Sequence, residues 1–135
     1  MKAVRFVAIL SAALAAPALA QTPQGLSEGR TFEERGGEAL YAHVCAACHQ
    51  ADGGGAIGAG AYPALANDPR LISAQYVATL VLRGRAGMPP VGVMMNDDQV
   101  ADVVNYAREH FGGFREEPIS AAAIKALRSA PVKNP

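Results

Sequence analysis

The stretch Cys45-Ala46-Ala47-Cys48-His49 governs how the rest of this 135-residue chain is interpreted. If the segment is helical, Cys45, Cys48 and His49 share one face, because residues three and four positions apart are neighbours on a helix. Two thiols on one face can bond covalently to the edge of a haem while the imidazole reaches the iron. The stretch therefore predicts one covalently attached haem c, with His49 as an axial ligand of the iron.

The Cys-x-x-Cys spacing alone also occurs in zinc sites and in dithiol redox sites. The chain has only two cysteines, so no second pair completes a zinc site. It also lacks the strand–helix–strand pattern that surrounds a thioredoxin-like dithiol. Together with the adjoining His49, these observations favour haem. A dithiol pair formed by Cys45 and Cys48 is the alternative that haem staining of a denaturing gel would test.

The N-terminus has the pattern of a secretory signal. Lys2 and Arg5 precede an apolar run, and Ala18-Leu19-Ala20 offers a cleavage site before Gln21. We predict a signal peptide over 1–20, a flexible arm over 21–30 and a periplasmic location. The alternative is an uncleaved segment that acts as a weakly held anchor. The apolar run is shorter than the roughly 20 residues of a membrane span, so we expect no transmembrane span in the mature chain.

The charge balance excludes a nucleic-acid partner. Removal of residues 1–20 takes Lys2 and Arg5 from the twelve basic residues and leaves ten against twelve acidic ones. A nucleic-acid-binding domain would instead show an excess of Lys and Arg. Composition therefore indicates only a small exported globular domain.

Helical periodicity predicts an all-α fold with three main helices. The first is expected from about residue 32 to Cys48, with a capping box over 31–34, or else only after Gly37 because glycine disfavours a helix interior. The glycine-rich stretch 50–62 is expected to be a flexible loop, without convincing strands anywhere in the chain. Ser73 caps a second helix that runs to about Arg83, with Val77, Leu80 and Val81 on one face and Gly84 at its end.

A third helix is expected to open with Asn96, Asp97 and Asp98 and to stop at Gly112-Gly113. Its apolar stripe comprises Val100, Val103, Val104, Ala107 and Phe111, and the residues expected to face away are Asp102, Asn105, Arg108 and Glu109. Ser120 caps a short helix through Arg128. We therefore predict a haem domain over 31–113 and a C-terminal extension over 114–135.

A second axial ligand is expected from a methionine, because a thioether opposite His49 closes the coordination of the iron. Met88 is favoured, since Pro89 disfavours helix there and stiffens the loop that must present the sulfur. Met94 and Met95 adjoin the third helix and are expected to be apolar filler. His43 and His110 are not expected to be ligands. Arg83 and Arg85 either contact the haem propionates, steer a partner or are simply solvated.

These residues resemble a class I cytochrome c from about Arg35 to Gly113. The resemblance rests on Gly37-x-x-x-Tyr41-x-x-x-Cys45-x-x-Cys48-His49, on Gly87-Met88-Pro89 and on Val103-Val104-Asn105-Tyr106. It implies three main helices wrapped around one covalent haem, plus a short C-terminal helix here. It further implies that Gly37 and Tyr41 meet Val103 and Tyr106, and that the Pro63 carbonyl orients His49.

A narrower likeness is to the haem modules in cytochrome subunits of bacterial alcohol, aldehyde and sugar-acid dehydrogenases. It rests on residues 62–67, 98–106 and 123–128. Those subunits often carry three haems, whereas this chain has one motif. The resemblance implies an electron carrier rather than an enzyme, with a periplasmic dehydrogenase as donor and a downstream cytochrome or oxidase as acceptor. The alternative is a haem protein with a labile sixth ligand that binds gas ligands or peroxide.

Overall fold

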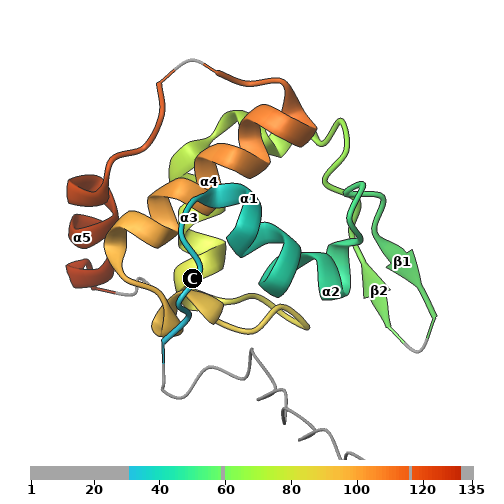
Figure 1. Cartoon of the computed structure of the whole chain (residues 1–135), viewed down its shortest axis with the longest axis horizontal. Helices are drawn as coiled ribbons and strands as arrows, with labels where there is room; N and C mark the ends of the chain where they lie inside the picture. The colour runs from blue at the N-terminus through green and yellow to red at the C-terminus, as the bar shows by residue number, and fades with distance from the viewer. Residues whose placement is uncertain (1–30, 59, 116, 132–135) are drawn as a thin grey trace, which may run out of the picture.

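The computed structural model describes residues 31–58, 60–115 and 117–131 (Figure 1). The predicted signal peptide and flexible arm lie outside the described residues. Among the described residues, none of the helices combines the length and apolar character needed to cross a membrane.

The described chain is mostly helical, as predicted, and folds as one bundle (Figure 1). Its elements are α1 (Gly37–Leu40), a π-helical turn η1 (Tyr41–Cys45), α2 (Ala46–His49), β1 (Ala56–Ile57), β2 (Ala61–Tyr62), the 3-10 turn η2 (Pro69–Ile72), α3 (Ala74–Arg83), the 3-10 turn η3 (Val91–Met94), α4 (Asp97–Gly112) and α5 (Ala121–Ser129). The expectation of no strands was wrong. β1 and β2 pair antiparallel around a glycine-rich tip where the Gly58 amide donates to the Gly60 carbonyl.

The first helix starts later than predicted, at Gly37, close to the alternative start. The preceding segment is held by long-range hydrogen bonds and not by a capping box. The Phe32 amide donates to the Met94 carbonyl at 3.0 Å. The buried Gln99 side chain donates to the carbonyls of Phe32 and Glu34 at 2.8 and 2.9 Å. These bonds tie the approach to α1 onto the beginning of α4.

Helices α1 and α4 pack directly against each other, with α1 in front of α4 in Figure 1. Gly37 lies so close to α4 that a Cβ there would overlap the Asp102 carbonyl and the Cβ of Tyr106. One turn later, the ring of Tyr41 lies 5.7 Å from the ring of Tyr106 and 4.7 Å from that of Phe111. The expected approach of Gly37 and Tyr41 to Tyr106 is therefore present in the structure.

Helix α3 follows its prediction closely. The Ser73 hydroxyl accepts from the Tyr76 amide at 3.2 Å, and Gly84 ends the helix with a φ of +69°. Val81 is buried, and Val77 and Leu80 are half-buried. The three form one wall of a cavity inside the bundle.

Helix α4 has the predicted cap, ending and apolar stripe. The five stripe residues are all buried, and Gly113 adopts a left-handed conformation at the C-terminus. Asn96 and Gln99 form a reciprocal capping box, each side-chain oxygen accepting from the other's backbone amide at 2.8 and 2.9 Å.

The expectation that Arg108 faces away from the core was wrong, since Arg108 is only 4% exposed. Its guanidinium donates to the carbonyls of Leu71, Ile72 and Glu117. These acceptors come from η2 and from the extension after α4. Arg108 is therefore buried because it satisfies carbonyls of chain segments distant in sequence.

We expect Asn96→Ala to lower the free energy of unfolding by about 1 kcal/mol, because the change removes one half of the capping box. Denaturant unfolding of the purified protein measures the loss. Gln75→Ala is the matched control, an exposed helical amide whose removal should change stability by less than about 0.5 kcal/mol. Equal stability of the two variants would contradict the role of the cap.

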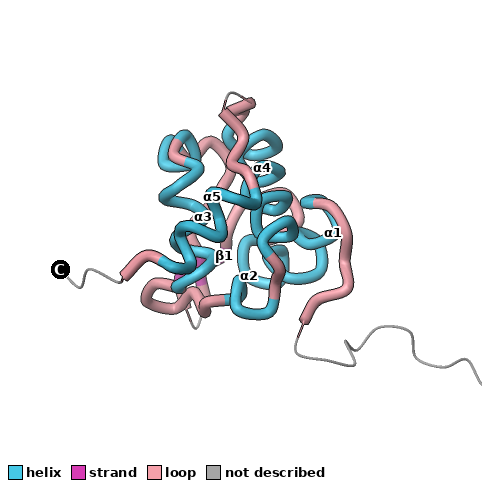
Figure 2. Tube along the Cα trace, turned by 90° about the vertical axis from the view of Figure 1, so that its left-hand side faces the viewer, coloured by secondary structure: helices cyan, strands magenta, loops and turns pink. Residues whose placement is uncertain are grey.

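The C-terminal extension packs against the bundle through α5 (Figure 2). Ser120 caps α5 as predicted, its hydroxyl accepting from the Ala123 amide. Ile124 is fully buried. The Arg83 guanidinium donates to the carbonyls of Leu127 and Ala130, both at 2.8 Å. Figure 1 shows α5 on the opposite side of the molecule from the β1–β2 hairpin.

Candidate haem site

The residues of the Cys-x-x-Cys-His stretch open onto one cavity of about 370 Å³. Its walls come from η1 and α2, the hairpin, α3, α4 and the loop that contains Met88. Most of the lining side chains are apolar, among them Val77, Leu80, Val81, Val103, Val104 and Ala107. Cys45, Cys48, His49, Pro63, Arg85 and Met88 all line this same cavity.

The His49 ring is oriented by the backbone. Nδ1 of His49 lies 3.0 Å from the Pro63 carbonyl oxygen. A carbonyl only accepts, so Nδ1 carries the proton and Nε2 keeps its lone pair free for a metal. Such an outer hydrogen bond fixes the orientation of a ligating imidazole and raises its basicity.

A tight turn after α2 brings Pro63 to His49. The Gly55 amide donates to the His49 carbonyl at 3.0 Å. Gly55 has a φ of +68°, and a Cβ there would overlap the Tyr62 carbonyl. From the sequence, this stretch was predicted only to be a flexible loop. The dense glycines were the available signal that the backbone must approach itself closely there.

Tyr41 also belongs to the site, because it is one of the residues that line the cavity. Its hydroxyl donates to the Gln50 carbonyl at 2.7 Å. Burial raises the pKa of the Tyr41 phenol to about 12, so the hydroxyl remains protonated and keeps that bond at neutral pH. Tyr41 thereby ties η1 to the turn that carries the chain from His49 to Pro63.

The environment of the Cys45 thiol argues against a dithiol redox pair. Burial, with a smaller effect of Cys48, raises the pKa of the Cys45 thiol to about 11. Reactive dithiols instead have a lowered thiolate pKa. In the part of the chain that the structure describes, no group of three or more His, Cys, Asp and Glu side chains is placed to hold a metal ion.

Met88 is presented by a short backbone hairpin. The amides and carbonyls of Arg85 and Met88 exchange two hydrogen bonds of 2.9 Å. Gly84 packs beneath this turn, where a Cβ would come within 3.0 Å of the Pro90 nitrogen. Met94 and Met95 do not line the cavity, and Met95 is buried in the core.

The structure separates the two arginines that flank Gly84. Arg85 lines the cavity and its guanidinium lies 3.4 Å from the Tyr76 hydroxyl. The Arg83 guanidinium instead donates to a carbonyl near the C-terminus of α5, and Arg83 does not line the cavity. Arg70, which was not predicted from the sequence, also lines the cavity and pairs with Asp68 at 2.7 Å.

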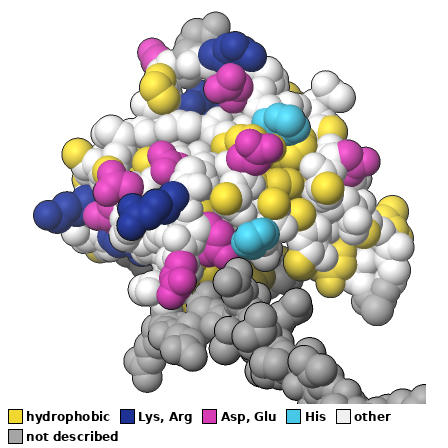
Figure 3. Space-filling model, in the orientation of Figure 1, with side chains coloured by type: hydrophobic (Ala, Val, Ile, Leu, Met, Phe, Trp, Pro, Cys, Tyr) yellow, Lys and Arg dark blue, Asp and Glu magenta, His cyan; other side chains and the backbone are white. Residues whose placement is uncertain are grey.

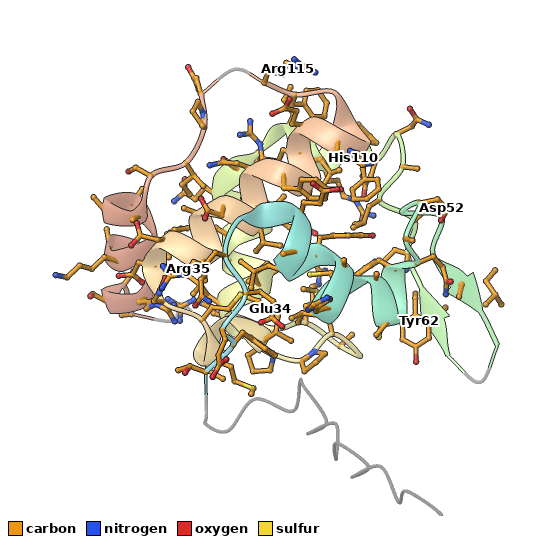
Figure 4. All side chains as sticks on the ribbon, in the orientation of Figure 1. Glu34, Arg35, Asp52, Tyr62, His110 and Arg115 are labelled. Carbon is orange, nitrogen blue, oxygen red and sulfur yellow. The ribbon has the colours of Figure 1, made fainter. Side chains whose placement is uncertain are left out.

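His43 and His110 lie away from the cavity lining. His43 Nδ1 lies 2.9 Å from a Glu34 carboxylate oxygen, and this hydrogen bond lowers the pKa of Glu34. The His110 ring stacks on Tyr106 at 4.9 Å. Glu34 and His110 are labelled in Figure 4. Figure 3 shows acidic and basic side chains interspersed on the face of the molecule that is turned toward the viewer in Figure 1.

The donor set fits a haem c. Two thiols, an imidazole with one nitrogen free and a thioether surround a single cavity with apolar walls. These are the groups that covalent attachment and axial ligation of a c-type haem require.

Comparison with known proteins agrees with this chemistry. The family described as cytochrome c oxidase, cbb3-type, subunit III matches residues 32–106, which is more than half of the chain. The chain therefore belongs to this cytochrome c family, and membership implies a haem c.

The chain is also similar to cytochrome subunits of dehydrogenases. It is 35% identical over 104 residues to the gluconate 2-dehydrogenase cytochrome c subunit of Pantoea cypripedii, covering 68% of this chain and 24% of the relative. It is 29% identical over 128 residues to the alcohol dehydrogenase (quinone) cytochrome c subunit of Komagataeibacter europaeus, covering 84% and 27%. The fructose dehydrogenase cytochrome subunit of Gluconobacter japonicus is 31% identical over 108 residues, covering 69% and 22%.

The narrower resemblance drawn from the sequence is thus confirmed. The chain spans about a quarter of the length of the curated relatives it matches.

Proposed function

We propose that the chain is an exported monohaem c-type cytochrome that carries single electrons between a donor dehydrogenase and a downstream cytochrome or oxidase. Cys45 and Cys48 hold the haem covalently, and His49 and Met88 are its axial ligands. One observation carries the proposal. The two thiols, the thioether and an imidazole whose Nδ1 faces the Pro63 carbonyl line the same cavity.

A bound haem c supplies one-electron chemistry through its Fe(III)/Fe(II) couple. The protein's part is to keep the surroundings constant while the charge changes. His49 and Met88 would both hold the iron, so neither oxidation state would need a new ligand. The Pro63 carbonyl fixes the His49 ring, and α3 and α4 give the cavity apolar walls. Arg85, which lines the cavity, contacts a haem propionate in this proposal, whereas Arg83 does not.

The donor is inferred from the relatives, which are named as cytochrome subunits of gluconate, alcohol and fructose dehydrogenases. We propose a periplasmic location after removal of residues 1–20. Residues 31–113 form the cytochrome domain, and residues 114–135 form an extension. Partners approach the side formed by the Cys motif and the Met88 loop. Small interfaces are usual for such redox encounters.

The test uses the full chain expressed with its own signal sequence in a host that matures c-type cytochromes. We expect haem stain to stay with the chain on a denaturing gel, and the mass to exceed the polypeptide by one haem. We expect the reduced protein to bind no carbon monoxide at neutral pH, because Met88 fills the sixth position. A colourless chain of bare polypeptide mass contradicts haem attachment. Carbon monoxide binding would instead favour the labile-ligand alternative.

A further inference from the structure

We propose that Arg128, in the last turn of α5, is a positioning residue for the Met88 thioether. Arg128 positions the thioether by fixing the chain segment that comes directly after the Met88 loop. This inference rests on the proposed function, because it takes Met88 as an axial ligand. It assigns the C-terminal extension a direct influence on the haem site, although α5 does not contribute to the lining of the cavity.

All three nitrogens of the Arg128 guanidinium donate hydrogen bonds to the segment that follows the Met88 loop. Nη1 donates to the Gly92 carbonyl at 2.9 Å and Nη2 donates to the Met95 carbonyl at 2.7 Å. Nε donates to the Asp97 carboxylate at 2.7 Å. The guanidinium thus connects η3, the residue that follows η3 and the first residue of α4. A rigid planar fork is suited to this task, since its donors have a fixed spacing.

The opposite side of η3 rests on α3. A Cβ on Gly92 would come within 2.9 Å of the Val81 carbonyl and 3.1 Å of the Leu82 Cα. The Met94 carbonyl accepts from the Phe32 amide. The segment is therefore clamped between α3, the approach to α1 and Arg128, and only Arg128 among these contacts comes from α5.

The clamp lies close to Met88 along the chain. Gly92 is four residues after Met88, and two of the residues between them are Pro89 and Pro90. Proline fixes φ, so this connection has few ways to absorb a displacement. A shift of η3 is therefore transmitted to Met88, whose own hairpin with Arg85 depends on the same loop.

Helix α5 offers Arg128 a fixed base. Ile124 is fully buried between the helices, and Arg83 holds the carbonyls of Leu127 and Ala130. Arg83 and Arg128 thus act at the same helix end but on different partners. Arg83 secures α5 itself, whereas Arg128 connects α5 to the Met88 loop. This difference allows a positioning role to be separated from a structural one.

The test measures how readily imidazole displaces the axial methionine from the ferric holoprotein. We expect Arg128→Gln to tighten imidazole binding about tenfold, equivalent to about 1.4 kcal/mol, because the unclamped loop retains the thioether less well. Arg128→Lys keeps the charge but cannot span two carbonyls, and should fall between wild type and Arg128→Gln. Lys125→Ala, an exposed change on the same helix, should leave imidazole binding unchanged.

Arg83→Gln is the decisive control, because it removes the hydrogen bonds of Arg83 to α5 and keeps the three that Arg128 itself donates. We expect it to lower the stability to denaturant but to change imidazole affinity by less than threefold. Equal effects of Arg83→Gln and Arg128→Gln on imidazole affinity would overturn the proposal. So would a folded Arg128→Gln holoprotein with wild-type affinity. If Arg128→Gln does not fold, wild-type affinity in Arg128→Lys overturns it.

A failure of the proposed function has a different signature. In that case the wild-type chain carries no covalent haem, or Met88→Leu has the same imidazole affinity as wild type. Either result removes Met88 as the ligand, and the inference about Arg128 falls with it. A wild-type chain with covalent haem and a Met88→Leu variant that binds imidazole more tightly leave the Arg128 comparison as the remaining question.

Discussion

Replacing Met88 by histidine is expected to lower the reduction potential of the holoprotein by about 0.2 V or more, within the roughly 0.8 V that axial ligands span in haem proteins. A thioether favours Fe(II) relative to an imidazole, which is why Met/His ligation raises the potential of cytochromes c. Met88 lines the cavity that contains His49, so the new imidazole starts from a suitable place. Potentiometric titration of the purified protein measures the shift.

Met94→Leu is the control for this substitution. Met94 lies in η3 but does not line the cavity, so its replacement should leave the potential and the optical spectrum as they are. A wild-type potential in the Met88→His holoprotein would remove Met88 from the coordination of the iron. A large shift in Met94→Leu would mean that Met94, and not Met88, supplies the sulfur.

Replacing Gly37 by alanine is expected to destabilise the protein by about 2 kcal/mol, as overpacking at a tight contact costs about 1–3 kcal/mol. The new Cβ meets the Asp102 carbonyl and the Tyr106 Cβ, and neither of these can rotate away. The α1–α4 contact must therefore open. Helix propensity acts in the opposite direction and favours alanine by about 1 kcal/mol. A lower free energy of unfolding in the variant therefore means that the steric contact outweighs helix propensity.

Denaturant unfolding of the holoprotein measures the change. Gly58→Ala is the control, since a Cβ at Gly58 meets nothing within 4 Å. We expect that variant to lie within about 0.5 kcal/mol of wild type. Increased stability of Gly37→Ala would mean that α1 and α4 are not in close contact in solution.

The sequence predicted best where structure is decided locally. Three helix caps show this: the side chains of Ser73, Asn96 and Ser120 each accept a hydrogen bond from the backbone amide three residues later. The same short range explains why Gly84 and Gly113 were correctly placed at helix ends. The apolar stripe of α4 was also predictable, because helical periodicity repeats over its four turns.

The failures share a dependence on distant partners. The pattern over 31–34 favoured a helix start, but Gln99 and Met94 supply hydrogen bonds to the segment instead. Arg108 has the sequence appearance of a solvated residue, yet its acceptors lie on η2 and after α4. No local pattern encodes such contacts.

The candidate site shows the same division. The Cys-x-x-Cys-His stretch is five consecutive residues, so the sequence alone predicts it as a haem attachment motif, and the structure places its residues on one cavity. Arg83 and Arg85 flank one glycine and were indistinguishable in sequence, but Gly84 turns the chain so that Arg85 lines the cavity while Arg83 contacts α5. That outcome depends on where the last helix packs.

The π-helical turn over Tyr41–Cys45 allows one short helical run to contact α4 with its first half and face the cavity with its second half. Cys48 comes eleven residues after Gly37, about three full turns of an uninterrupted α-helix, which would aim both residues at α4. A wide turn accommodates about one extra residue and so rotates the later residues by roughly 100°. The half that begins with Gly37 can then dock on α4 while the half with Cys48 and His49 turns toward the cavity. The spacing between Gly37 and the two thiols therefore has to include the extra residue of the π-helical turn. Without that residue, Gly37 and Cys48 would face the same neighbour.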